Sequence, residues 1–315
     1  MATSRRRKRS AWAERALSLA WGAWSELGVS GWSRTHASWA VDPEPLILFT
    51  AGLSDQDPRL RDEAADWCIR HWRFVSRVRL RNLLDDQPAA VLAGYGPFAA
   101  TVNAHAGVSW PGATEPWARY RPSGRSTLRP LEEPALVCLR LRAMFGVSAR
   151  AEILRHLLAQ PGRGLSAARL AALAGYAKRN IAEECDMLER AGLVAHRADG
   201  NRFIYSLASR RELEAFVGHV PDVFPRWGAL STVVGALVAL GDAEVNLSPE
   251  AFTVEVHRTL HDLRGALDEL ELDGSPRLLK GAELWPELQK WGDELLAGLA
   301  SGHWPGHQPR KHATA

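Results

Sequence analysis

Three consecutive side chains, Lys178, Arg179 and Asn180, are of types that can read the edges of DNA bases. Lysine and arginine donate to O6 and N7 of guanine, and asparagine pairs with the edge of adenine. Apolar spacing predicts a helix over residues 177–191, and a helix that enters the major groove makes its base contacts with its first turns. Glu183 in the same helix could accept a hydrogen bond from the N4 amino group of cytosine. The alternative is that these are solvated surface charges and that Asn180 bonds to the local backbone.

Other polar side chains near this helix could contact the sugar–phosphate backbone. Ser166 and Tyr176 precede it in the sequence and carry hydroxyl groups that can donate to phosphate oxygens. Further along, Asp199-Gly200 is a strong signal for a two-residue hairpin turn between two predicted strands. The side chains that flank this turn could enter the adjacent minor groove, or could be surface charges on neighbouring strands; they are Arg197, Asn201 and Arg202.

A run of five basic residues stands near the N-terminus: Arg5, Arg6, Arg7, Lys8 and Arg9. Like charges in one block repel each other and bury nothing, which predicts an arm without fixed structure over residues 1–10. Such an arm could lie along a phosphate backbone, so Arg5, Arg6 and Arg7 join the predicted DNA contacts. A solvated tail is the competing interpretation.

The elements that must position these side chains follow one another as helix, helix, glycine turn, helix, strand and glycine-tipped hairpin. Ser148 and Ser166 are of the type that caps a helix, Gly175 suits a tight turn, and Gly192 is placed to end the helix that contains Lys178. The stretches that carry this pattern are AEILRHLL (151–158), LSAARLAALAG (165–175), LERAGLV (188–194) and RFIYSL (202–207).

With these stretches, residues 148–208 resemble the ArsR/MarR-type winged helix-turn-helix transcriptional regulators. The AGLV junction before the first strand and the YSL end of the second strand are the most specific features, and the resemblance is confined to about residues 148–208 of the 315. The resemblance implies a DNA-binding fold that a homodimer usually presents. It implies no particular operator and no particular effector.

Composition predicts a mainly α protein of ordinary globular type, 46% hydrophobic and 24% charged, with length for about two domains. Residues 1–208 carry 29 Lys/Arg and 20 Asp/Glu, a net charge of +9, whereas residues 209–300 carry 8 and 16, a net charge of −8. We therefore expect only the first part to meet a polyanion, unless this segregation arose by chance. The expected units are a basic arm (1–10), an N-terminal helical domain (11–106), a Pro/Gly-rich linker (107–133), a winged-helix domain with a small hairpin (134–208), an acidic C-terminal helical domain (209–300) and a disordered tail (301–315).

The N-terminal helical domain allows two interpretations. Residues 58–105 echo the helix-turn-helix pattern and could be a degenerate second copy, in which Arg73, Arg77, Arg79 and Arg81 would add phosphate contacts. The favoured alternative is a helical domain for docking or dimerisation. The chain has 13 tryptophans, seven of them within the first 72 residues, and large rigid aromatic side chains serve cores and interfaces. We expect them to form core and dimer contacts.

Several function classes lack support in the sequence. It has no phosphate-binding loop, no dinucleotide fingerprint, no GxSxG and no HExxH, so we expect no catalysis and no cofactor. Its three cysteines are widely spaced, which favours a reducing cytoplasm, and Cys185 lies on the apolar stripe of its helix. His257 and His261 could share a helix face but lack an obvious third ligand, so no metal is expected. The longest apolar stretch, 229–240, is too short for a membrane span.

These features predict a sequence-specific transcriptional regulator, most simply a repressor, that binds double-stranded DNA as a cytoplasmic homodimer. The alternative is a protein-interaction module, such as an antitoxin-like or defence-associated component, whose winged helix contacts a protein and whose acidic C-terminal region is a binding surface.

Overall fold

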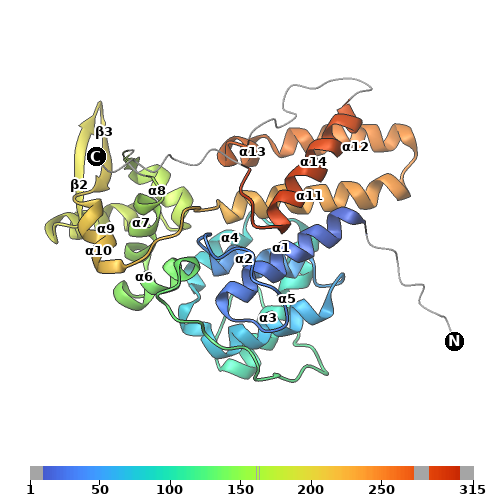
Figure 1. Cartoon of the computed structure of the whole chain (residues 1–315), viewed down its shortest axis with the longest axis horizontal. Helices are drawn as coiled ribbons and strands as arrows, with labels where there is room; N and C mark the ends of the chain where they lie inside the picture. The colour runs from blue at the N-terminus through green and yellow to red at the C-terminus, as the bar shows by residue number, and fades with distance from the viewer. Residues whose placement is uncertain (1–9, 161, 163, 273–283, 306–315) are drawn as a thin grey trace.

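The computed structural model describes residues 10–160, 162, 164–272 and 284–305. Within these residues the fold is mainly helical with one small three-stranded antiparallel sheet, which confirms the predicted fold class at this level. In Figure 1 the C-terminal helices lie above the N-terminal ones, and the sheet lies at the left together with α7, α8, α9 and α10.

The N-terminal bundle consists of α1 (Ala11–Leu27), α2 (Pro43–Gly52), α3 (Pro58–His71), the 3-10 turn η1 (Trp72–Phe74), α4 (Arg77–Leu84) and α5 (Ala89–Ala106). Asp57 caps α3 by accepting hydrogen bonds from the backbone of Arg59 and Leu60, as its place before Pro58 predicts. α2 is buried on all sides. We expect tryptophans to form core contacts, and this is confirmed for five whose rings are buried: Trp12, Trp21, Trp24, Trp39 and Trp67.

The C-terminal helices share one hydrophobic core with this bundle. They are α11 (Trp227–Asn246), α12 (Pro249–Asp262), α13 (Arg264–Leu270) and α14 (Leu284–Ala300). α11 packs against α1 and α2, and the Trp12 indole on α1 donates to Asp293 on α14 at 3.0 Å. In the described part of the chain, α11 is the one helix long and apolar enough to cross a bilayer, and the side chains that it buries, such as Leu230 and Leu237, belong to this shared core.

The Pro/Gly-rich segment 107–133 contains no helix and no strand, and it runs along the N-terminal bundle. Trp110 is buried, and Trp117 packs edge-on against Phe98 of α5 at 5.8 Å between ring centroids. The backbone N–H of Gly124 donates to Asp66 of α3 at 2.9 Å. We call this segment the strap, because these contacts attach it to α3 and α5.

A second hydrophobic core holds the candidate site. The 3-10 turn η2 (Pro134–Leu136) still belongs to the first core and leads into it. The elements of the second core are α6 (Val137–Phe145), α7 (Ala149–Leu158), β1 (Leu165–Ser166), α8 (Ala167–Ala174), α9 (Lys178–Arg190), β2 (Val194–Asp199), β3 (Arg202–Leu207) and α10 (Arg210–Val217). The strand order is β1-β3-β2, and the turn between β2 and β3 is the predicted one at Gly200, where φ is +60°. Sequence patterning misses β1, which has two residues.

Six buried charged side chains join this second core to the N-terminal bundle. We call them the ion cluster: Asp42, Glu44, Arg79, Arg142, Glu152 and Arg155. Arg79 of α4 makes two hydrogen bonds of 2.7 Å to Asp42. Arg142 of α6 bridges Glu44 and Glu152, with distances of 2.7 to 2.9 Å. Three arginines balance three carboxylates, so the charges are compensated where water is excluded.

Glu152 of the ion cluster and the neighbouring His156 make the stability of the protein depend on pH. Burial alone would raise the pKa of Glu152, but Arg142 and Arg79 outweigh burial and bring this pKa to about 2. Burial and the neighbouring Arg155 and Arg226 hold the pKa of His156 well below its ordinary value of 6.5. Both groups therefore bind protons more weakly in the folded state than in the unfolded state.

We accordingly expect the free energy of unfolding to fall as the pH drops below 6.5, first through His156 and again below about pH 4.5 through Glu152. Protonation of the unfolded His156 alone costs about 1 kcal/mol per pH unit in the first interval. Urea unfolding at pH 7.5 and pH 5.5 measures this loss. Burial also lowers the pKa of His36 and His71, so the His156→Gln variant isolates the effect by showing a smaller loss than the unchanged protein. An equal loss in both proteins would show that His156 does not contribute.

Candidate nucleic-acid interface

The first turn of α9 presents the three predicted base-reading side chains to solvent. Lys178, Arg179 and Asn180 are all exposed, and the Arg179 side chain retains 90% of its accessible surface. On the opposite side of the same helix Ile181 and Cys185 are buried in the second core. The apolar stripe therefore fixes which side of α9 faces outward, and the acidic C-terminal helices leave the first turn uncovered.

The backbone at the start of α9 is also open. Ala177 occupies the capping position and supplies no side-chain acceptor, so the first N–H groups of the helix keep their hydrogen-bonding capacity. N–H groups at such an end, together with the helix dipole, favour a phosphate. Gly175 ends α8 with a φ of +67°, a conformation that glycine adopts without strain, and it sets the angle between α8 and α9.

Most acidic side chains of α9 contact a neighbouring basic side chain of the protein. Glu183 accepts from Arg179 at 2.8 Å, Glu184 pairs with Arg150 of α7 at 2.8 Å, and Glu189 pairs with His196 of β2 at 2.7 Å. The two contacts with arginine reduce the negative charge that an approaching phosphate would meet on this helix. The pair with Arg179 also places Glu183 beside the predicted base-reading residues, where the contact with cytosine stays a prediction.

The two predicted hydroxyl contacts differ in their surroundings. Ser166 caps α8, and its side-chain oxygen accepts from the backbone N–H of Arg169 at 3.2 Å, which leaves its own hydrogen free to donate. Tyr176 is half-buried, and its hydroxyl lies 2.9 Å from the hydroxyl of Ser76 in the N-terminal bundle. Burial raises the pKa of Tyr176. The Tyr176 hydroxyl is thus engaged within the protein, and its phosphate contact stays a prediction that competes with this bond.

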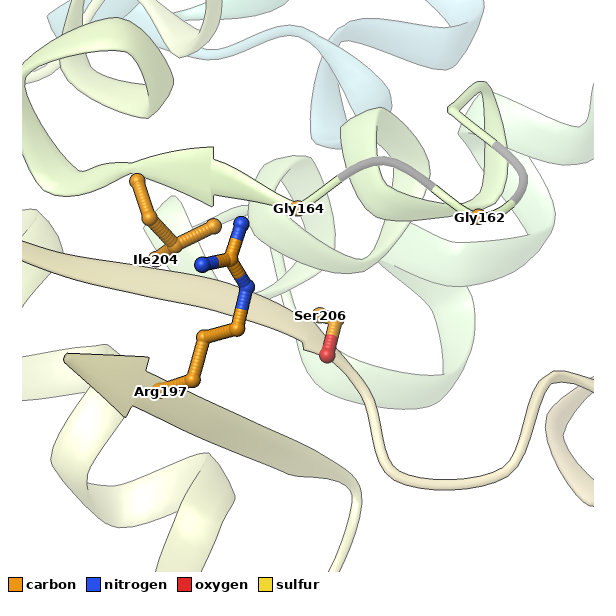
Figure 2. Close-up of a pocket in the computed structure, with 5 residues that line it drawn as sticks. All are labelled: Gly162, Gly164, Arg197, Ile204 and Ser206. Carbon is orange, nitrogen blue, oxygen red and sulfur yellow. The ribbon is translucent and has the colours of Figure 1, made fainter. Parts of the chain in front are cut away.

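The hairpin β2–β3 carries the remaining predicted contacts. Asn201 and Arg202 are exposed at its tip beside Gly200. Arg197 instead reaches across β3 toward Gly164 near the base of the hairpin (Figure 2). There it lines a pocket of about 340 Å³ together with Gly162, Gly164, Ile204 and Ser206. Arg197 is therefore placed to bind an anion at the face of the sheet, whereas Arg202 is placed to enter a groove of DNA.

Arg5, Arg6 and Arg7 lie outside the described residues. In the described part of the chain, no group of three or more His, Cys, Asp or Glu side chains is arranged to hold a metal ion. Cys185 is buried as its place on the apolar stripe predicts, and burial raises the pKa of its thiol to about 12.

One contact that the less favoured interpretation of the N-terminal bundle predicts is wrong. A second helix-turn-helix would place Arg79 among the phosphate contacts, but its side chain is 2% exposed and belongs to the ion cluster. Its Nε atom also donates to the carbonyl oxygen of Ala174 at the end of α8, at 2.9 Å. The sequence pattern misses this contact because α4 and α8 are about ninety residues apart along the chain.

No protein-family model, no curated protein and no solved structure matches the chain. The resemblance to winged helix-turn-helix regulators therefore rests on the sequence of residues 148–208.

Proposed function

We propose that this protein is a cytoplasmic transcriptional regulator of the winged helix-turn-helix type, related to the ArsR/MarR regulators, that binds a specific sequence of double-stranded DNA. The observation that carries the proposal is the outward-facing first turn of α9, which combines Lys178, Arg179 and Asn180 with an uncapped helix N-terminus. Such a turn supplies base-edge donors and a site for a backbone phosphate together.

The hairpin supports the same proposal. α9 packs on β2, so a duplex whose major groove receives α9 also approaches the exposed tip with Asn201 and Arg202. The basic arm with Arg5, Arg6 and Arg7 would add phosphate contacts. A homodimer would present two such surfaces, and two-fold symmetry then requires a palindromic operator with half-sites about one helical turn apart. Repression by occupancy of the operator is the simplest consequence.

A titration with salt tests this proposal without knowledge of the operator. We expect binding of the full-length protein to a random-sequence duplex of about 30 base pairs to weaken at least tenfold between 50 and 200 mM salt, because bound phosphates release counterions. Fluorescence anisotropy of a labelled duplex measures the affinity at each salt concentration. Absence of binding at 50 mM salt, or binding without salt dependence, would argue against a nucleic-acid interface.

The second candidate function is a protein-interaction module. It is favoured by two exposed apolar side chains near the same surface, Met187 on α9 and Phe203 on β3, each 53% exposed. Apolar side chains of this size supply area in protein interfaces. A protein that works only through such contacts would not bind the DNA duplex at low salt, so the same titration separates the two functions.

A further inference from the structure

Helix α4 of the N-terminal bundle is docked directly beside the turn that leads into α9. Asn82 donates from its side-chain amide to the carbonyl oxygen of Gly175 at 2.9 Å. Arg79 donates to the carbonyl oxygen of Ala174 at the same distance, and the hydroxyl groups of Ser76 and Tyr176 are 2.9 Å apart. Three contacts along one helix therefore fix the position of α4 relative to the candidate recognition helix.

The face of α4 that points away from the protein is basic. Arg77 and Arg81 are four residues apart, so they lie on the same side of the helix, and both are exposed. Neither guanidinium group makes a hydrogen bond or an ion pair with another described residue. The inward face is held by Leu80 and by Arg79 in the ion cluster. α4 is thus a rigidly mounted helix with two unpaired cations on its outer side.

The bond of Asn82 to Gly175 keeps α4 close to the first turn of α9. Lys178 follows Gly175 by three residues, which span at most about 10 Å, and Arg81 is the neighbour of Asn82. The phosphates of each DNA strand follow one another at about 3.4 Å along the helix axis. A duplex that receives α9 in its major groove therefore carries several phosphates within reach of long side chains on α4. Asp85 and Asp86 follow α4 and confine the basic surface to its earlier turns.

We propose that Arg77 and Arg81 of α4 form a second phosphate-binding element, which contacts the DNA backbone outside the groove that α9 reads. This inference rests on the proposed function and names residues that the winged-helix region does not contain. The contacts add affinity without adding sequence preference, because phosphates carry no base information. The docking contacts of Ser76, Arg79 and Asn82 hold the element in place before DNA arrives.

The double variant Arg77→Ala/Arg81→Ala tests the inference in the full-length protein. Its matched control is Arg119→Ala/Arg121→Ala, which removes two exposed arginines from the strap. Affinity is measured over a range of salt concentrations for a random-sequence duplex and for a duplex that the protein itself has enriched from a random library. Circular dichroism during heating verifies that both variants fold.

We expect the α4 variant to bind both duplexes about tenfold more weakly at low salt. We also expect the slope of log affinity against log salt to shrink by about two per subunit. The control variant should keep the affinity and the slope of the unchanged protein. An α4 variant that behaves like the control would overturn this inference and leave the proposed function in place. A loss confined to the enriched duplex would assign α4 to base reading and also overturn it. If the unchanged protein does not bind the random-sequence duplex and enriches no duplex from the library, the proposed function fails and this inference fails with it.

Discussion

Replacement of both Lys178 and Arg179 by alanine should abolish the preference of this protein for its own target sequence. Each well-formed contact of such a side chain with a base edge discriminates by about 1–3 kcal/mol, so the loss of two should weaken binding to the enriched duplex by about a hundredfold or more. Binding to a random-sequence duplex should fall far less, because most of its affinity comes from phosphates contacted elsewhere.

The fold should survive this double replacement. Both side chains are exposed, and the one ion pair that is lost, between Arg179 and Glu183, lies at the surface, where water screens it and it contributes little to stability. Competition binding with the two duplexes measures the preference, and thermal unfolding verifies the fold. The control variant Arg119→Ala/Lys290→Ala removes the same two residue types from exposed positions on the strap and on α14. A Lys178/Arg179 variant that folds and still selects the same sequence would show that α9 is not the reading helix.

Replacement of Arg142 by methionine should lower the stability of the protein far more than the loss of any surface ion pair. Arg142 is fully buried and holds two carboxylates, Glu44 and Glu152, which would be left with an uncompensated negative charge. Removal of one partner from a buried ion pair lowers the free energy of unfolding by about 3–5 kcal/mol. Urea unfolding should show this loss as a lower midpoint with an unchanged slope.

Two further variants test the contribution of Arg142 to stability even if Arg142→Met does not fold. Arg142→Lys keeps the charge but loses the planar, two-pronged donor, so its loss should be smaller. Arg150→Ala breaks a partly exposed ion pair with Glu184 and should change the free energy of unfolding by less than about 1 kcal/mol. Equal stability of Arg142→Lys and Arg150→Ala, with Arg142→Met close to the unchanged protein, would contradict the importance assigned to the ion cluster.

Local signals in the sequence predict the start of α3 in the N-terminal bundle and several elements around the candidate site. Asp57-Pro58 places the start of α3, Ser166 caps α8, and Gly200 forms the hairpin turn. Each signal works because one residue type satisfies a local backbone demand, such as an open N–H group or a positive φ. The exposure of Lys178 follows in the same way from the apolar stripe on the other side of α9.

The contacts between distant segments could not be predicted. Asp42 and Arg155 are 113 positions apart, and in a single sequence each resembles an ordinary surface charge. Only the tertiary contact between the start of α2 and α7 excludes water from them and makes their pairing strong. The same limit applies to Asn82, whose bond to Gly175 reveals the docked α4, and to Tyr176, whose hydroxyl meets Ser76 where the sequence suggests a phosphate.

Selection from a random library of duplexes tests the central claim most directly. The full-length protein is mixed with the library at low salt, the bound duplexes are recovered and sequenced over several rounds, and the Lys178→Ala/Arg179→Ala variant is taken through the same rounds. The account predicts that the unchanged protein enriches a palindromic motif with half-sites about 10 base pairs apart and that the variant enriches none. Recovery of duplexes without any shared motif, or the same motif from both proteins, would contradict it.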